Sequence, residues 1–295
     1  MRLILNNGKS VSRLYSTPQP PEANFIFKID TSLGDGQAEF EFKASHTGAV
    51  DYTIDWGDSS TTHVTSNVNS NHIYLAGGVY NISLSIISGL NKPTFYNTND
   101  RIKVTDILNW GTYEWDSFTS FLYDMDNLVN ISAPDYPNLQ GSNLLQTFIY
   151  NSSSLVSLNI GSWVLNSSTS LLQAFRQAPS FNDPTINNLD TTGVFSMSKA
   201  FWVASSFNQN LSNWNVESVG DMTDCFLSSA LDNVNYRLIL IGWTGWTSGA
   251  PTKTLQSNVP AHFGTAKYEI GGESEDVRNY LTGTLGWTIT DGGGI

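Results

Sequence analysis

The sequence predicts a mainly β protein with short helices, in which a small β-sandwich precedes a short solenoid of repeats and a C-terminal cap. Two observations lead to this fold class. Apolar and polar residues alternate strictly in Ala38–Lys43 and Tyr80–Ile86, as they do in half-buried strands. Phenylalanines recur every 25 to 27 residues in the second half of the chain, a period typical of solenoids.

The first two segments are an N-terminal arm and the sandwich. Residues 1–22 end in a proline-dense stretch, which predicts an extended arm that does not pack. Residues 23–105 contain the alternating runs, separated by glycine-rich turns. Several short strands at this spacing are typical of a sandwich.

The repeat array is expected over residues 106–249, with a cap at 250–295. A unit of about 26 residues cannot bury its apolar face alone, so neighbouring units are expected to stack and share one core. Within the cap, residues 273–281 predict a short helix and 287–290 a strand that covers the last repeat. Each repeat has two apolar marker positions, which are Phe121, Phe148, Phe175, Phe201 and Phe226, followed by Leu128, Leu155, Phe181, Phe207 and Leu231.

The sandwich segment resembles a PKD domain, which has an immunoglobulin-like fold. This family has a Trp-Gly-Asp-like turn after a central strand, then a His-x-Tyr, a glycine, and a tyrosine that opens an alternating strand. The resemblance implies a spacer or interaction module rather than a catalyst. The residues that match this pattern are Trp56, Gly57, Asp58, His72, Tyr74, Gly78 and Tyr80.

The array resembles the BspA-like leucine-rich repeat surface proteins, the DUF285 type. The unit from Phe207 reads Phe-Asn-Gln-x-Leu-x-x-Trp-x-Val, close to the pattern of that family, whereas the units at Phe148 and Phe175 diverge. Members of the family are familiar as bacterial surface adhesins, and similar sequences occur in structural proteins of tailed phages. The resemblance therefore implies a leucine-rich-repeat-type solenoid that is displayed on a surface.

Charge and composition argue against several partners. The formal net charge is -12 and only 14% of residues are charged. Phosphate binding needs clustered Lys and Arg, so no nucleic-acid partner is expected. No stretch reaches the roughly 18 apolar residues of a membrane span, so no membrane insertion is expected. Cys225 is the only cysteine, which excludes an intramolecular disulfide and favours a small buried apolar role.

Catalytic and metal-binding signatures are weak. Asp51, Asp55 and Asp58 cluster around one turn, where Asx turns are favoured over a Ca²⁺ site. No cofactor or metal is expected, and the chain is expected to be non-enzymatic. Glycosidases need two facing carboxylates, but helix capping is the favoured explanation of the available pairs. These pairs are Glu114 with Asp116, Asp124 with Asp126, and Asp221 with Asp224.

Tryptophans of the array are the candidate ligand-binding residues. Periodic aromatic residues are usually core, but Trp202 breaks the period by following Phe201 directly. Trp246 lies in a glycine-rich segment together with Trp243. Because aromatic rings stack on sugars, we expect Trp202 and Trp246 to be exposed and, with Trp243, to form a glycan-binding surface.

The sequence thus predicts a non-enzymatic structural or adhesion protein. Since no leader or anchor is visible, a phage virion component, as a fibre or a capsid or tail decoration, is favoured over a secreted bacterial adhesin. The arm at 1–22 is expected to attach to other virion or cell-envelope proteins. The ligand is expected to be a host glycan or surface protein, and the chain is a candidate homo-oligomer. The alternatives are a glycan-active enzyme with a PKD spacer and a decoration protein that binds nothing else.

Overall fold

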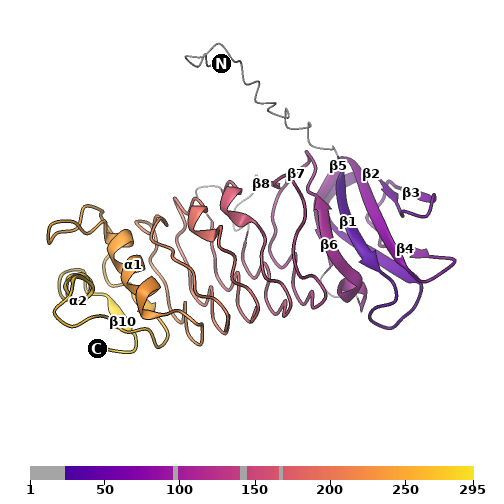
Figure 1. Cartoon of the computed structure of the whole chain (residues 1–295). Coiled ribbons are helices and arrows are strands. Elements are labelled where there is room, and N and C mark those ends of the chain that lie inside the picture. The colour runs from indigo at the N-terminus through magenta and orange to yellow at the C-terminus, as the bar shows by residue number, and fades with distance from the viewer. Residues whose placement is uncertain (1–23, 96–98, 140–144, 166–168) are drawn as a thin grey trace, which may run out of the picture.

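The computed structural model describes residues 24–95, 99–139, 145–165 and 169–295, so the expected arm at 1–22 lies outside the described residues. The described part is mainly β with a few short helices. A sheet lies at one end of the molecule, and a stack of chain turns runs from it to the C-terminal helices (Figure 1).

The sheet is antiparallel and open. Its strands follow the order β3-β2-β5-β1-β6, and β4 pairs with the first half of β2. The two alternating runs that predicted strands fall in β2 and β5, except that Ala38 directly precedes β2, so both are confirmed as strands. The strands are β1 (Phe25–Asp30), β2 (Glu39–Asp55), β3 (Thr61–Val64), β4 (Ser70–Ile73), β5 (Val79–Thr94) and β6 (Val104–Asn109).

An aromatic core connects the sheet with the stack of turns. The ring centroid of Phe25 on β1 lies 6.0 Å from that of Trp110 and 6.2 Å from that of Phe121. All three side chains are buried. The expected boundary near residue 105 falls inside β6, which pairs with β1. After β6, the short strands β7 (Glu114–Trp115) and β8 (Asn138–Leu139) pair in parallel.

A fully buried lysine directly precedes β6. Lys103 ends the 3-10 helix η1 (Asn99–Lys103), and its ammonium lies 2.6 Å from Asp100 and 3.0 Å from Asp35. It also donates to the carbonyls of Gln37 and Glu39. Burial alone would lower the pKa of Lys103, but the hydrogen bonds and charges of its two carboxylate partners outweigh this and raise it.

Five homologous segments, which we call rungs, form one side of the stack. In each of the first four rungs, the first, third and fifth residues donate backbone hydrogen bonds to carbonyls of the next turn. From the first rung to the second, Ser120, Leu122 and Asp124 donate bonds of 2.9 to 3.1 Å. The rungs are residues 120–124, 147–151, 173–177, 199–203 and 224–228.

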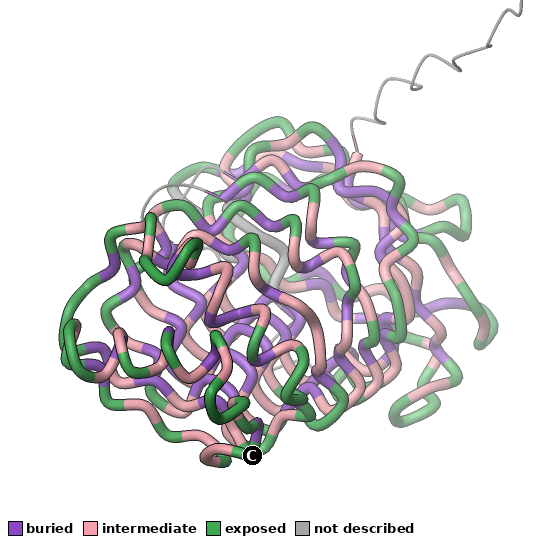
Figure 2. Tube along the Cα trace, turned by 60° about the vertical axis from the view of Figure 1, so that its left-hand side comes forward, coloured by how far each residue is buried: buried purple, intermediate pink, exposed green. Residues whose placement is uncertain are grey.

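Each rung begins and ends in the left-handed region. The first and fifth residues of all five rungs have φ values from 51° to 60°, although none is glycine. Between them, the second and third side chains are buried and the fourth is partly exposed. Figure 2 shows this alternation of buried and exposed residues along the turns. The two left-handed residues thus send two side chains inward and one outward in every rung.

The phenylalanine period combines two different rung positions. Phe121 and Phe148 occupy the second position, whereas Phe175, Phe201 and Phe226 occupy the third. In the first two rungs the third position holds Leu or Ile, and in the last three the second position holds Ala or Cys. All ten side chains are buried, so the predicted phenylalanine core is confirmed but its register shifts by one residue after the second rung. The expected buried role of Cys225 is also confirmed, and burial raises the pKa of its thiol.

A second side of the stack is built from close backbone contacts and tryptophans. The 3-10 helices η2 (Ile160–Ser162) and η3 (Ile186–Asn188) lie on successive turns. The helix α1 (Asn233–Thr244) continues this side, and a Cβ on its Gly242 would collide with Ser212 of the preceding turn. The sequence did not predict α1 as a helix.

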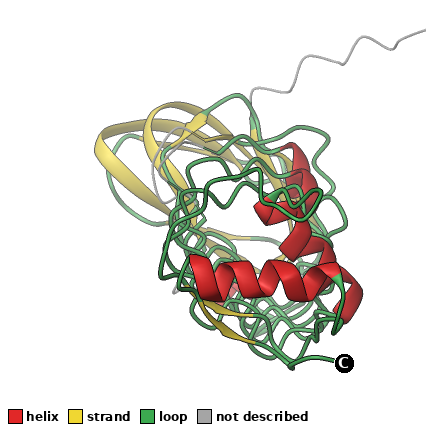
Figure 3. Cartoon of the chain, turned by 90° about the vertical axis from the view of Figure 1, so that its left-hand side faces the viewer, coloured by secondary structure: helices red, strands yellow, loops and turns green. Residues whose placement is uncertain are grey.

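The C-terminal end covers the last rung. Strand β9 (Pro260–His262) pairs in parallel with β10 (Thr288–Thr290), which confirms the final strand predicted from the sequence. The helix α2 (Glu273–Asn279) continues into the π-helix η4 (Tyr280–Thr284), near the predicted range. Figure 3 looks along the stack from this end and shows the turns superposed behind α1 and α2.

A buried polar network fastens the end of the chain to the helices. The carboxylate of Asp291 is 3% exposed and accepts from the Arg278 Nε and the Tyr236 hydroxyl, each at 2.7 Å. The guanidinium also lies 4.9 Å from the ring centroid of Tyr268. These contacts connect α1, α2 and the last residues of the chain.

Candidate ligand-binding surfaces

The PKD-like motif residues expected from the sequence form one cluster within and beside the antiparallel sheet. The Trp56 ring is fully buried and stacks on His72 at 4.9 Å, and His72 meets Tyr74 edge to face at 4.5 Å. Tyr74 stacks on Tyr80 at 3.9 Å and donates its hydroxyl to the Trp56 carbonyl. Gly78 lies between the two tyrosines in sequence, and its N–H donates to Thr31 Oγ1 at 2.9 Å.

The polar end of this cluster has the residue types of a catalytic triad but not the geometry. His72 Nε2 lies 2.7 Å from Asp58 and 3.4 Å from the Ser60 hydroxyl, so both partners meet the same ring nitrogen. A triad needs the carboxylate on one nitrogen and the hydroxyl on the other. The hydroxyl of Ser60 and the ring of His72 lower the pKa of Asp58 to about 2. Gly57 has φ 82°, and a Cβ there would collide with the Asn81 carbonyl.

The aspartates around this turn stabilise the backbone. Asp55 accepts from the Gly57 N–H at 2.9 Å, and Asp58 accepts from the N–H of Ser60 at 3.0 Å. Asp51 instead pairs with His63. Within the described residues, no group of three or more His, Cys, Asp or Glu side chains is placed to hold a metal ion. The geometry is therefore that of Asx turns, the interpretation favoured from the sequence.

The fourth positions of the rungs line up on the outside of the stack, and we call them the outer column. Tyr123 and Tyr150 stack at 5.0 Å with an angle of 2° between their rings. The guanidinium carbon of Arg176 lies 4.9 Å from the ring centroid of Tyr150 and 4.0 Å from that of Trp202. The column consists of Tyr123, Tyr150, Arg176, Trp202 and Leu227, all partly exposed.

Trp202 reaches the surface, but one face of its ring is covered. The Arg176 guanidinium lies over the indole, and Lys199 Nζ is 5.1 Å from the ring centroid. A sugar can stack on this ring only where the guanidinium leaves it free. The site therefore offers an aromatic edge flanked by two cations, rather than the open aromatic platform expected from the sequence.

The other two candidate tryptophans have different environments. Trp243 is 2% exposed and donates its indole N–H to the Leu211 carbonyl at 2.8 Å. Trp214 makes the same kind of bond to Ile186 one turn earlier. Trp243 is thus a repeated core residue and offers no ring to a ligand. Trp246 is partly exposed and packs against Tyr280, with the ring centroids 5.8 Å apart.

Two of the three predicted carboxylate pairs have structural roles. Asp124 forms an ion pair with Arg101 at 3.1 Å and accepts from the Asn151 amide of the next rung. The neighbouring Asp126 accepts from the Ser153 hydroxyl at 2.7 Å. Asp221 accepts from the Thr223 N–H at 2.9 Å, and its pair member Asp224 is a left-handed rung residue. These two pairs therefore order loops within the stack.

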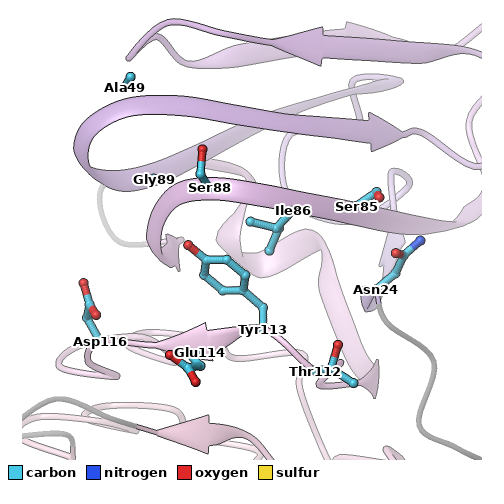
Figure 4. A pocket seen from close by; sticks show the side chains of 10 residues that line it. All are labelled: Asn24, Ala49, Ser85, Ile86, Ser88, Gly89, Thr112, Tyr113, Glu114 and Asp116. Atoms are coloured by element: carbon cyan, nitrogen blue, oxygen red, sulfur yellow. The ribbon is translucent and has the colours of Figure 1, made fainter.

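The remaining pair, Glu114 with Asp116, lies in a groove. Glu114 and Asp116 line an open depression of about 670 Å³ between the paired strands β2 and β5 and the segment around β7. In Figure 4 the ring of Tyr113, the residue before β7, extends toward Ile86 and Ser88 of β5. Burial raises the pKa of Tyr113, and the negative charges of Asp116 and Glu114 add to this.

Sequence reasoning found Trp202 but missed its neighbours in the outer column. Tyr123 and Tyr150 come two residues after their phenylalanines, whereas Arg176 and Trp202 come one residue after theirs. The column could have been found from the sequence only if the one-residue shift had been recognised.

The repeat segment also matches a known family. Residues 142–237 match the family described as "Mycoplasma protein of unknown function, DUF285". The second to fifth rungs lie within this range. No curated protein and no solved structure matches the chain. The match confirms the DUF285 resemblance for this part of the chain. Among the described residues, no helix has both the length and the apolar character that crossing a membrane requires.

Proposed function

We propose that the chain is a non-enzymatic recognition protein, with a structural or adhesion role, whose stacked rungs form the binding surface. The observation that supports this best is the outer column, in which equivalent side chains are partly exposed on five successive rungs. A repeated surface suits an extended ligand, because many weak contacts add up along it. The DUF285 match over 142–237 is consistent with this role, since BspA-like proteins are surface adhesins.

We interpret residues 23–105 as a PKD-like, immunoglobulin-like sandwich and residues 106–249 as a leucine-rich-repeat-type solenoid. The stacked cluster from Trp56 to Tyr80 supports the first assignment. The regular backbone bonds between rungs support the second. In this interpretation the sandwich is a spacer that carries the array.

We further propose that the protein is displayed on a virion surface, with a bacterial cell surface as the alternative. The BspA-like resemblance is compatible with both settings. Immunogold labelling with an antibody against this chain distinguishes them. Labelled phage particles would support the first setting, and labelled envelopes of uninfected cells would contradict it.

The recognition role is tested by binding of the purified chain to immobilised glycans and to host cells. Trp202→Ser should abolish binding, because it interrupts the outer column. Tyr136→Ser is the control, since Tyr136 is an exposed aromatic residue outside the column. Equal binding by both variants would contradict the assignment to the column. If the chain binds no ligand but its removal destabilises particles, the decoration role replaces recognition.

The groove favours one second candidate, a glycan-active enzyme. Glu114 and Asp116 line it together with the aromatic side chain of Tyr113, the residue types that glycosidases use. Release of reducing sugar from polysaccharides by the purified chain is the assay. Turnover that disappears in Glu114→Gln and Asp116→Asn would establish this activity and overturn the non-enzymatic assignment.

A further inference from the structure

We infer that the outer column recognises a glycan that carries negative charges, with Arg176 and Lys199 as its anion-binding pair. This rests on the proposed recognition function and specifies its ligand class. The two side chains lie at 4.0 and 5.1 Å from the ring centroid of Trp202. Aromatic surface and positive charge therefore meet at one place on the third and fourth rungs.

Within the part of the chain that the structure describes, Arg176 and Lys199 form no ion pair with a carboxylate. Among the described residues, neither Arg176 nor Lys199 has a carboxylate oxygen within 4.0 Å, although the protein carries a net charge of -12. Of the ten Lys and Arg side chains that the structure describes, six form ion pairs with carboxylates; of the other four, Lys253 donates to the Gly242 carbonyl and Lys267 is an exposed residue near the C-terminus. The six described cations that form ion pairs with carboxylates are Lys28, Lys43, Arg101, Lys103, Arg237 and Arg278.

The Arg176 guanidinium is held in a fixed orientation before any ligand binds. Arg176 lies between Tyr150 and Trp202, and its Nη1 donates to the Gln173 amide oxygen at 3.0 Å. These contacts fix the plane of the group, so binding an anion costs little further side-chain entropy. No described residue accepts a hydrogen bond from its Nη2. A guanidinium with a free edge is suited to a carboxylate or sulfate group.

The side chains beside the column indicate that the anion is carried by a sugar chain. The first and fifth positions of the second and third rungs, on both sides of the column, hold uncharged side chains with hydroxyl or amide groups, namely Thr147, Asn151, Gln173 and Gln177. Hydroxyls and amides of this kind suit the hydroxyl groups of sugars. A nucleic acid would place a phosphate at every step and needs many cations, whereas this surface has two. A sugar chain with widely spaced charges matches both features.

The positive site is limited along the stack by Asp224. This residue occupies the rung position of Lys199 in the next rung, and the Lys199 N–H bonds to the carbonyl of the preceding Thr223. Its carboxylate repels an anion that extends in that direction. Removing this charge should therefore strengthen binding, which gives the test a change of opposite sign.

The experiment uses the purified full chain and three immobilised polysaccharides: hyaluronan with carboxylates, dextran sulfate with sulfates, and uncharged dextran. Binding is measured by biolayer interferometry at low and at physiological ionic strength. At least one charged polymer should bind, dextran should not, and added salt should weaken binding. A preference between the two charged polymers identifies the anionic group.

The variants separate charge recognition from stability. Lys199→Gln and Arg176→Gln should each weaken binding about tenfold or more, and Asp224→Asn should strengthen it. Lys267→Gln, a lysine of the cap, is the control and should leave it unchanged. Because Arg176 also supports the ring stack, Lys199→Gln keeps the test valid if the arginine variant does not fold.

Three outcomes would overturn the inference. Dextran bound as tightly as the charged polymers, or unchanged binding by Lys199→Gln, would show that charge is not recognised at this site. Loss of neutral-glycan binding in Trp202→Ser alone would also refute the inference, but it would leave the proposed recognition function intact. Host-cell binding that persists in Trp202→Ser would instead refute the recognition surface itself.

Discussion

Val203 ends its rung in the left-handed region, with φ 60°, although it is β-branched. This conformation costs an L-residue roughly 1–2 kcal/mol, and valine is among the residues that adopt it least readily. Asparagine tolerates it and occupies the same position in the second rung, as Asn151. We therefore expect Val203→Asn to remove about 1 kcal/mol of backbone strain.

The control for this variant is Val156, which is 40% exposed compared with 36% for Val203, and which has no positive φ. Val156→Asn measures the loss of apolar burial alone, so Val203→Asn should be more stable than Val156→Asn by about 1–2 kcal/mol. Urea denaturation followed by tryptophan fluorescence gives both values. If the two variants lose equal stability, the left-handed rung ends are not strained and the argument fails.

Three further predictions concern packing and charge. Asp291→Asn weakens the buried network of the cap and should lower the free energy of unfolding by about 2 kcal/mol or more in urea denaturation; a loss below about 0.5 kcal/mol would contradict it. Gly242→Ala should lower the melting temperature, because its Cβ would collide with the neighbouring turn. Gly283→Ala, which has open space, should not, and equal effects would refute the close approach. Because the pKa of Asp58 is lowered from its ordinary value of 3.8, the ionised carboxylate stabilises the fold at pH values above 3.8. This contribution is lost as the pH falls toward about 2. The stability difference between wild type and Asp58→Asn should therefore shrink over that range in acid titrations, and a difference independent of pH would exclude the mechanism.

The strands were predictable because each has one buried face. In β5, Ile82 and Leu84 are buried while Asn81 and Ser85 are exposed, and this contrast is present in the sequence itself. The motif cluster was predictable for a related reason, since Gly57 is required by a turn with positive φ close to another backbone segment. Local patterns of this kind do not depend on distant parts of the chain.

The helix α1 was missed although its ends carry ordinary signals. The Asp232 side chain caps the first turn by accepting from the Asn235 N–H at 2.8 Å, and Gly245 ends the helix with φ 60°. The apolar run before Trp243 resembled the end of a repeat. The helix packs against the preceding turn at Gly242, and residues needed for this contact interrupt the apolar pattern that would otherwise indicate a helix.

The candidate site was only partly predictable, because contacts between rungs depend on register. Trp202 stood out as a break in the phenylalanine period, and the structure places it at the surface. Its contact with Arg176 joins residues 26 positions apart in two rungs, and no local pattern reports that spacing. A shift of one residue between rungs decides which side chains stack.

The rung geometry makes the fold independent of the side chains on the proposed binding surface. The bonds between rungs run from the backbone N–H groups at the first, third and fifth positions to backbone carbonyls of the next turn, including the carbonyl of the fourth position in the next rung, so they do not depend on the side chain at the fourth. The second and third positions compensate for each other, with Phe before Leu or Ile in two rungs and Ala or Cys before Phe in three. The outer column, by contrast, holds Tyr, Tyr, Arg, Trp and Leu without any such constraint. If the outer column binds the ligand as proposed, a change of ligand requires changes only at the fourth positions and their left-handed neighbours, where Arg176 and Lys199 lie.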